Sequence, residues 1–252
     1  MISFVTAIKL MPLYEDYARR LEMYIECVAE GMRGSAFEII VVEDQSDKNV
    51  AWIRNAFTSE WLDARNARLV EYAAEYPNPH GYNMIEAYAK NVGLSLAKYP
   101  YVCLTNCDVL FNAAFFDLCK CRLQPRTFYR FLEYETTPVV SWNLKKIQET
   151  FAASTCINEG LLTQRNLKTV AFKSGDAMLM DTESWKLIRG FPENEVWVHS
   201  DLIVCNVVNN NGFALVVDEE AKVYTYPQER DVVEREFELA KTYDYFYRRT
   251  CN

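Results

Sequence analysis

The sequence predicts an α/β protein whose sheet is mainly parallel and whose chain forms one domain. Three observations predict this class. Short apolar runs alternate with amphipathic segments through the first 110 residues, as in repeated strand-helix units. The apolar runs are continuous rather than alternating with polar residues, which is typical of strands buried on both faces of a parallel sheet. No repeat and no linker rich in Pro, Gly or Ser divides the 252 residues into separate units.

The first half of the chain contains four candidate strands separated by three candidate helices. The strands share short, apolar, often β-branched composition and are expected at 2–8, 37–42, 68–72 and 101–105. Helices are expected at 14–32, 49–58 and 82–98, either because apolar residues recur at helical spacing or because the segment connects two predicted strands. This alternation predicts helices packed over a parallel sheet.

The second half is less regular but contains the same kinds of element. Strand-like runs are expected at 128–134, 138–142, 168–173, 176–181 and 213–217. Helices are expected at 112–124, 182–188, 200–209 and, in an amphipathic tail, 229–247. Asp181 or Thr182 is the expected N-cap of the 182–188 helix.

Composition excludes several kinds of site. The chain has 27 Lys and Arg against 35 Asp and Glu, a formal charge of −8. A broad nucleic-acid surface needs clustered cations, so this balance argues against one. The 8 glycines are roughly half the usual share, which leaves little for glycine-rich phosphate loops. The only histidines are His80 and His199, so a site built on several histidines is excluded.

The cysteines and the N-terminus predict an intracellular environment. No basic segment followed by an apolar stretch opens the chain, and no apolar run approaches the roughly 18–20 residues that span a bilayer. We therefore expect a cytoplasmic protein with eight reduced cysteines. Four of the cysteines form a minor candidate zinc site: Cys103, Cys107, Cys119 and Cys121. Their C-x3-C and C-x-C spacings are not the C-x2-C pairs usual in zinc sites.

Polar side chains follow three of the predicted strands. They lie in the segments 6–9, 43–47 and 106–108, and the carboxyl ends of parallel strands line the ligand site of such sheets. No G-x-G-x-x-G and no G-x4-G-K-[ST] motif is present, so a nucleotide would be held by side chains and a metal. Asp44 is suited to accept from a base N–H, and Asp108 to bind Mg²⁺ or Mn²⁺ across two phosphates.

Three stretches carry motifs in a recognisable order. FEIIVVEDQSDKN (37–49) matches apolar-apolar-V-[DE]-D-x-S-x-D. AYAKNVGLSLAKYPYVCLTNCDVLF (87–111) matches A-[RK]-N-x-G-x3-A, then a strand and D-x-D, with Asn106 in place of the first Asp. KSGDAMLMDTESWKLIRGFPENEVWVHSDL (173–202) matches a G-x-x-x-[LM]-M strand, a helix, G-G-F-x-E and an acidic motif, with Arg189 in place of the first Gly. Together these stretches resemble the GT-A glycosyltransferases, especially the family 2 type, over about two thirds of the chain.

The resemblance implies a nucleotide-binding half in residues 1–110. Asp44 would contact the base, and Asp108 would bind the Mn²⁺ or Mg²⁺ ion. Asn106 can accept a hydrogen bond but brings no charge, so the dependence on metal is open. The full set of nucleotide-binding candidates is Thr6, Asp44, Lys90, Asn91, Asn106 and Asp108.

The resemblance also implies an acceptor-binding half in residues 111–227, followed by a C-terminal helix at 228–252. Asp201 best matches the family's catalytic base, because an acceptor hydroxyl must lose its proton as the sugar C1–O bond breaks. Glu193 and Glu195 are the alternative bases. The candidates for acceptor contacts are Asp176, Trp197 and His199.

The function implied is transfer of a sugar from a nucleotide-diphosphate donor, most commonly a UDP-sugar in this family, to a hydroxyl of a glycan or other acceptor, with inversion. Two alternatives are open: a nucleotidyltransferase, and a non-catalytic relative that binds nucleotides or glycans. Asn106 favours the second. Asp44, Asp108 and Asp201 also have simpler interpretations, as caps or turn residues next to the helices expected at 49–58, 112–124 and 200–209.

Overall fold

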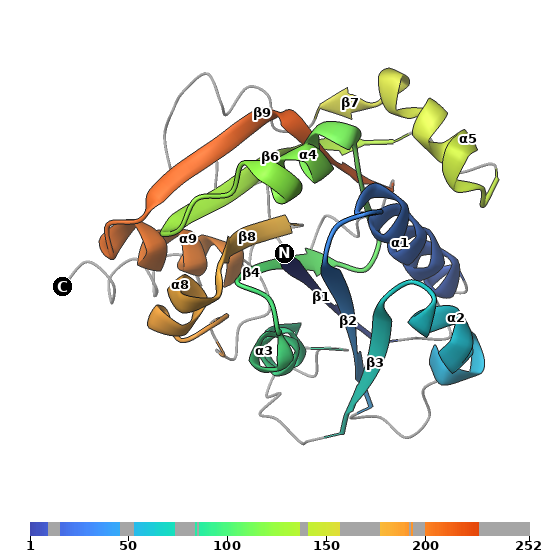
Figure 1. Ribbon diagram of the computed structural model, residues 1–252, viewed down its shortest axis with the longest axis horizontal. Coiled ribbons are helices and arrows are strands. Elements are labelled where there is room, and N and C mark those ends of the chain that lie inside the picture. The colour runs from blue at the N-terminus through green and yellow to red at the C-terminus, as the bar shows by residue number, and fades with distance from the viewer. Residues whose placement is uncertain are drawn as a thin grey trace, which may run out of the picture.

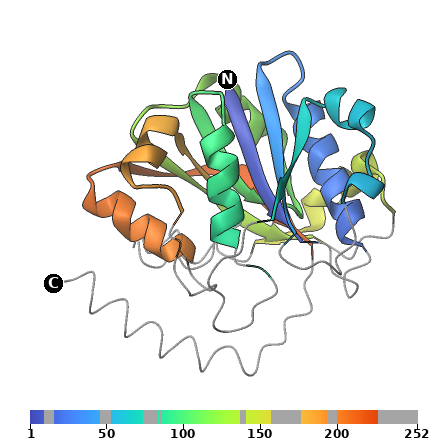
Figure 2. The ribbon, with the colours of Figure 1, turned by 90° about the horizontal axis from the view of Figure 1, so that it is seen from below.

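The computed structural model describes residues 1–9, 16–45, 53–73, 84, 86–136, 141–156, 177–191, 193 and 200–226. Within these residues, one sheet of nine strands is covered by helices on both faces (Figures 1 and 2). The strands are β1 (Ile2–Ile8), β2 (Phe37–Asp44), β3 (Ala67–Tyr72), β4 (Tyr101–Asn106), β5 (Val109–Phe111), β6 (Thr127–Glu135), β7 (Thr155–Cys156), β8 (Ala177–Asp181) and β9 (Ala214–Thr225). The helices are α1 (Tyr17–Gly31), α2 (Ser59–Asp63), α3 (Glu86–Leu96), α4 (Ala113–Cys121), α5 (Leu144–Glu149), α8 (Thr182–Leu187) and α9 (Ser200–Asn210), with 3₁₀ turns η1 (Ile53–Asn55) and η2 (Phe151–Ala153).

The sheet has the order β3-β2-β1-β4-β8-β6-β9-β5, and β7 pairs with β6. β3, β2, β1 and β4 are all parallel, which confirms the repeated strand-helix units predicted from the sequence. Every residue of β1 and β2 is buried, as continuous apolar runs require of central parallel strands. Because the four strands are parallel, their carboxyl ends meet at one edge of the sheet.

The second half extends the sheet with mixed pairing. β8 is antiparallel to both β4 and β6, and β9 is parallel to β6 and antiparallel to β5. The strands predicted at 128–134 and 176–181 are confirmed as β6 and β8. Asp181, one of the two expected caps, accepts from the backbone amide of Ser184 at 2.9 Å and begins α8. The mainly parallel α/β class is therefore confirmed.

Two apolar layers form the core, one on each face of the sheet. α1, α2, α4 and α5 pack over one face, where Phe4 of β1 contributes. α3, α8 and α9 pack over the other face, where Val5 of β1 contributes. Adjacent residues of β1 thus serve opposite layers, because side chains alternate along a strand. Both layers flank the carboxyl edge of the parallel strands (Figure 2).

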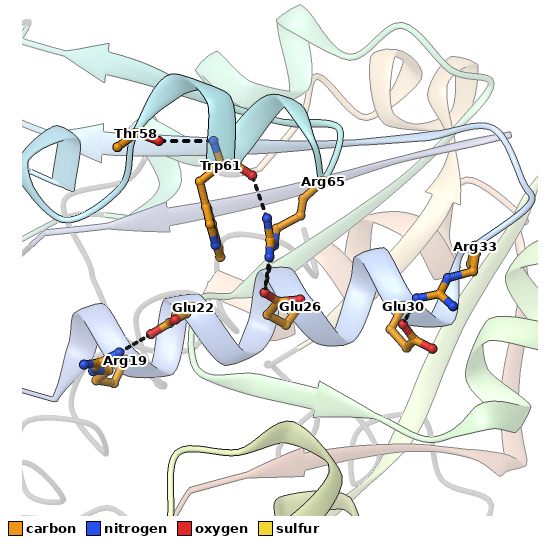
Figure 3. A network of polar contacts seen from close by, with 8 residues as sticks. All are labelled: Arg19, Glu22, Glu26, Glu30, Arg33, Thr58, Trp61 and Arg65. Atoms are coloured by element: carbon orange, nitrogen blue, oxygen red, sulfur yellow. Dashed lines mark hydrogen bonds and ion pairs between the residues drawn. The ribbon is translucent and has the colours of Figure 1, made fainter.

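Polar contacts join α1 to α2 at the surface (Figure 3). The guanidinium of Arg65 donates to the Glu26 carboxylate at 2.6 Å and lies 4.0 Å from the centroid of the Trp61 ring. Thr58 caps α2 by accepting from the backbone amide of Trp61 at 3.2 Å. The contact between Arg65 and Glu26 ties the end of the short α2 to the longer helix.

The helix predicted at 49–58 is wrong over its described part. Residues 53–55 form a 3₁₀ turn, and a separate helix, α2, begins at Ser59. Two hydrogen bonds explain the break. The buried carboxylate of Glu43 accepts from the backbone amide of Ile53 at 2.7 Å and anchors the 3₁₀ turn, and the cap at Thr58 starts a new helix.

The strand predicted at 213–217 is longer in the structure. β9 continues through the polar stretch at 218–222 to Thr225 because a bulge accommodates it beside β6. Phe131 of β6 pairs with Asp218, whereas the next residue, Leu132, pairs with Lys222. The carboxylate of Asp218 accepts from the amides of residues 220 and 221, as in a turn.

Several predicted elements lie outside the described residues: the strand at 168–173, most of the strand at 138–142 and the helix at 229–247. Among the helices that are described, none has the length and apolar character needed to cross a bilayer.

Candidate active site

The carboxyl ends of β2, β3 and β4 bring a set of polar side chains to one edge of the sheet. Asp44 ends β2 and pairs in register with Tyr72 at the end of β3. Asp44 is only 1% exposed. Burial, together with the charges of Glu193 and Asp44, raises the pKa of Tyr72, so its phenol stays a neutral hydrogen-bond donor. Asn106 ends β4 on the other side of β1.

Within the part of the chain that the structure describes, the residue that anchors the segment after β2 is Glu43, the neighbour of Asp44, which the sequence analysis did not single out. Glu43 is 1% exposed and accepts from both the amide of Ile53 and the side-chain amide of Gln45. Residues 46–52 lie outside the described residues, so the simpler interpretation of Asp44 as a cap for the 49–58 segment stays a prediction.

Lys90 and Asn106 are brought into direct contact. The ammonium of Lys90, on α3, donates to Asn106 Oδ1 at 3.0 Å and pairs with the Glu86 carboxylate at 2.7 Å. It also lies 5.4 Å from the centroid of the Phe191 ring. Lys90 is 1% exposed, so its charge is buried but compensated. The amide oxygen of Asn106, which was expected to accept from a ligand, thus already accepts one hydrogen bond from Lys90.

Asn91 holds the loop that follows α8. Its amide donates to the Phe191 carbonyl at 2.8 Å and to the Glu193 carboxylate at 2.8 Å, and it accepts from the Phe191 amide at 2.7 Å. These bonds use both hydrogens of the side-chain amide and its oxygen. The described contacts of Asn91 are therefore those of a support for the loop, and they do not test the predicted nucleotide contact.

The same loop explains the Gly-Gly-Phe pattern of the third motif. Arg189 and Gly190 have φ values of 64° and 79°, both in the left-handed region that glycine adopts without strain. A Cβ at Gly190 would also meet Asn91 Oδ1 at 2.5 Å. Arg189 therefore takes up a backbone conformation suited to the glycine that it replaces, and it is strained there.

Asp108 lies in the turn between β4 and β5 and is 5% exposed. It does not cap the next helix, since Asn112 accepts from the Phe115 amide at 3.1 Å and begins α4. Arg20 of α1 approaches it, with Nη1 3.5 Å from Asp108 Oδ2. A carboxylate expected to bind a cation thus lies beside a guanidinium.

The described residues do not form a metal cage by themselves. They contain no group of three or more His, Cys, Asp or Glu side chains placed to hold an ion. Asp108 offers one carboxylate, and the oxygen of Asn106 already accepts from Lys90. Mg²⁺ characteristically binds through one or two carboxylates together with phosphate oxygens and water. The residues present fit an ion that arrives with a diphosphate, rather than one held by protein alone.

Thr6 and the cysteines are deeply buried. Thr6 is fully buried in β1, and its hydroxyl has no hydrogen-bond partner among the described residues. Of the four cysteines considered for zinc, all but Cys121 are buried, and the described residues show no metal group that includes them. Burial raises the pKa of the Cys103 and Cys107 thiols, so they are neutral and part of the core.

The acceptor half is described only in part. Asp201 lies in the first turn of α9, which begins at Ser200 as predicted. Glu193, an alternative base, is bonded to Asn91. The three acceptor candidates, Asp176, Trp197 and His199, and the other alternative base, Glu195, lie outside the described residues.

Three side chains at this edge were missed by the sequence analysis: Glu86, Arg20 and Tyr226. Glu86 precedes Lys90 by one helical turn, which is the usual spacing of a helical ion pair and could have been noticed. Arg20 and Tyr226 are 206 positions apart in the numbering, yet the Arg20 guanidinium lies 5.2 Å from the Tyr226 ring centroid. No local pattern joins them.

Comparison with known proteins supports the fold. No family model matches the chain, and no curated protein sequence is significantly similar to it. In structure, the chain is similar to S. aureus TarS residues 1–349 in complex with UDP-GlcNAc, with a TM-score of 0.56, 15% identity and coverage of 91% of this chain and 59% of that one. It is also similar to S. aureus TarS 1–349 alone, with a TM-score of 0.55, 14% identity and coverage of 89% of this chain and 60% of that one. A further S. aureus TarS structure matches with a TM-score of 0.54, 13% identity and coverage of 90% of this chain and 36% of that one. This chain thus spans about 60% of the shorter TarS structures. Its order of parallel strands and these similarities show that it has the GT-A fold.

Proposed function

We propose that this chain is a glycosyltransferase that moves a sugar from a UDP-sugar to a hydroxyl of a glycan or another acceptor. One observation carries the proposal: two acids, Asp44 at the end of β2 and Asp108 in the turn after β4, lie at the carboxyl ends of parallel strands in a GT-A fold. A structure of the same fold, TarS, was obtained with UDP-GlcNAc. Carboxylates can accept from a base N–H and can bind the cation that accompanies a diphosphate.

For the donor, we assign the base to Asp44 and the diphosphate to the side of Asp108. Asp44 is buried at a strand end, where a hydrogen bond between its carboxylate and a base N–H group would form in a low-dielectric setting. Lys90, Asn106 and Asn91 support this region from α3 and β4 through the contacts described above. Thr6 contributes a buried hydroxyl in the central strand.

For the metal, we propose that Mn²⁺ or Mg²⁺ binds together with the nucleotide. Asp108 supplies one carboxylate ligand, and phosphate oxygens and water complete the coordination. When bound, such an ion neutralises the negative charge that develops on the leaving diphosphate. Asn106 adds no charge, so we expect weak binding of the metal in the absence of nucleotide.

For catalysis, we propose Asp201 as the general base. It is placed near the start of α9, after the acceptor motif, and its carboxylate would take the proton of the acceptor hydroxyl. A direct displacement of the diphosphate by that hydroxyl inverts the anomeric carbon. We assign the acceptor contacts to Asp176, Trp197 and His199.

Two measurements test this function. Isothermal titration calorimetry with UDP, GDP, CDP and ADP, with and without Mn²⁺, identifies the nucleotide. A screen of sugar nucleotides for slow hydrolysis identifies the donor without a known acceptor. Release of UDP from a UDP-sugar supports the glycosyltransferase. Consumption of a nucleoside triphosphate with release of inorganic pyrophosphate would support the nucleotidyltransferase instead, and failure to bind any nucleotide would refute both.

Substitution of the base separates an enzyme from a binding protein. Asp201→Asn should bind UDP with the affinity of the wild type and lose sugar transfer by a factor of about 10²–10⁴, which is the usual contribution of general base catalysis. A matched Ser200→Ala variant should retain transfer. If Asp201→Asn is fully active, Asp201 is not the base. If the wild type binds UDP but hydrolyses and transfers nothing, the non-catalytic alternative is favoured.

A further inference from the structure

Arg20 joins three segments that are far apart in the sequence. It lies in the first turns of α1, and its Nε and Nη2 both contact the Asp16 carboxylate at 2.8 Å. Its Nη1 faces Asp108, in the turn after β4, at 3.5 Å. Its guanidinium also lies 5.4 Å from the Tyr17 ring centroid and 5.2 Å from the ring centroid of Tyr226, the residue that follows β9.

The two sides of this guanidinium are held differently. The contacts with Asp16 have the length of strong charge-assisted hydrogen bonds, which is about 2.7–2.9 Å. The contact with Asp108 is longer by more than half an ångström, so Nη1 makes a weaker hydrogen bond than Nε and Nη2 do. The Arg20 side chain is 15% exposed and that of Asp108 is 6% exposed. A partially buried cation therefore presents one weakly engaged N–H group beside Asp108.

Tyr226 adds a second donor at the same place. It is 3% exposed, and its hydroxyl is buried with no hydrogen-bond partner in the described part of the chain. Burial raises the pKa of Tyr226, and Arg20 and Asp108 are near enough for their charges to act on it. The hydroxyl is therefore protonated and can donate. A buried donor without an acceptor is costly, and few native structures retain one without a reason.

We propose that Arg20 and Tyr226 bind the diphosphate of the donor directly. The inference rests on the proposed function and adds two residues to it. Both groups are donors, and diphosphate oxygens are acceptors that match a guanidinium fork particularly well. Binding exchanges the long contact between Arg20 and Asp108 for contacts with the diphosphate, and it gives the Tyr226 hydroxyl its acceptor.

The exchange also moves the charge of Arg20 away from Asp108, which favours binding of a cation there. In the absence of nucleotide, the charge of Arg20 partly neutralises Asp108 and opposes binding of Mn²⁺. With the nucleotide bound, Arg20 contacts the phosphates and Asp108 contacts the metal. Nucleotide and metal thus favour each other's binding, and UDP retains measurable affinity without any metal because Arg20 and Tyr226 still contact it.

The test measures the affinity of the full chain for UDP and for uridine, in EDTA and in Mn²⁺, by isothermal titration calorimetry. Arg20→Gln should weaken UDP binding in EDTA at least 10-fold, and Tyr226→Phe should weaken it about 3–10-fold, the range of one hydrogen bond. Neither variant should change the affinity for uridine, which lacks the diphosphate. Arg20→Gln should also bind Mn²⁺ alone more tightly than the wild type does.

Arg19→Gln is the matched control, because Arg19 is the preceding residue on α1 and its exposed side chain pairs with Glu22 (Figure 3). The control should bind UDP as the wild type does. If the wild type binds UDP and both Arg20→Gln and Tyr226→Phe bind it equally well, the inference is overturned while the proposed function stands. If the wild type binds no nucleotide, the proposed function itself fails. Should Arg20→Gln not fold, Tyr226→Phe decides alone, since it removes a hydroxyl that has no hydrogen-bond partner among the described residues.

Discussion

Gly93 determines how closely α3 can approach the sheet, and Gly93→Ala should destabilise the protein. A Cβ at this position would lie 2.3 Å from Val5 Cγ1 and 3.1 Å from Val42 Cγ2. Both valines are fully buried in central strands and have little room to move. Overpacking of this kind costs about 1–3 kcal/mol, and a contact more than 1 Å too short belongs at the upper end.

The methyl group also has a favourable effect that must be subtracted. Alanine is about 1 kcal/mol better than glycine within a helix, so the expected net loss for Gly93→Ala is about 2 kcal/mol. For a chain of this size, that corresponds to a fall of roughly 4–8 °C in the melting temperature. Because α3 carries Lys90 and Asn91, we also expect weaker UDP binding.

A double-mutant cycle tests the cause. Val5→Ala alone should cost about 2 kcal/mol through lost burial and a cavity, but it should also make room for the methyl group of Gly93→Ala. The second substitution should then be neutral or stabilising, which is a coupling energy of about 2 kcal/mol. Ser95→Ala, on the exposed side of α3, is the control and should change stability by less than about 0.5 kcal/mol. If Gly93→Ala is as stable as the wild type and uncoupled from Val5, this account of the packing is wrong.

Three further predictions each concern a single residue. Asn91→Ala removes the three hydrogen bonds to the 191–193 loop and should lower the free energy of unfolding by about 2–3 kcal/mol; an unchanged midpoint in urea would contradict this. For Asp181, burial raises the pKa, but hydrogen bonds from Ser184 and a backbone amide outweigh it and hold the pKa below its usual value. The stability contributed by this carboxylate is therefore present above about pH 4 and lost as the pH falls through the folded-state pKa, so Asp181→Asn, which keeps a capping side chain, should reduce the difference in melting temperature between pH 7 and pH 3. Arg189→Gly should raise the free energy of unfolding by up to about 1 kcal/mol. It removes left-handed strain of about 1–2 kcal/mol, and the greater conformational entropy of glycine in the unfolded chain offsets only part of this gain. A lower melting temperature would argue against strain at this residue.

The parallel half of the fold could be predicted because its signals are local. β1 coincides with the predicted strand, and β2 and β4 extend the predicted strands by two residues and one residue. Continuous apolar runs mark strands that are buried on both faces, wherever else the chain goes. Parallel strands have their carboxyl ends at the same edge of the sheet, so the placement of Asp44 and Asn106 at one edge could be predicted as well.

The errors arise where distant contacts determine local structure. The break between the 3₁₀ turn and α2 depends on Glu43, which lies ten positions before the amide that it anchors. The polar segment 218–222 has the composition of a turn, yet it is a bulge within β9 because β6 continues beside it. The Asp218 carboxylate in this segment accepts hydrogen bonds from nearby backbone amides, as in a turn, but the strand continues beyond it.

Two described cations at the carboxyl edge, Lys90 and Arg20, already have carboxylate partners. Lys90 is paired with Glu86 at 2.7 Å, and Arg20 with Asp16 at 2.8 Å and with Asp108 at 3.5 Å. Both of these cations are thus paired before a ligand arrives. A diphosphate would bring additional negative charge to a partly buried place in a chain whose formal charge is already −8. Its binding is favoured if a cation enters with it or if one of these two cations changes partners, and the contact of Arg20 with Asp108 is the longest of these pairs and the one that we expect to exchange first.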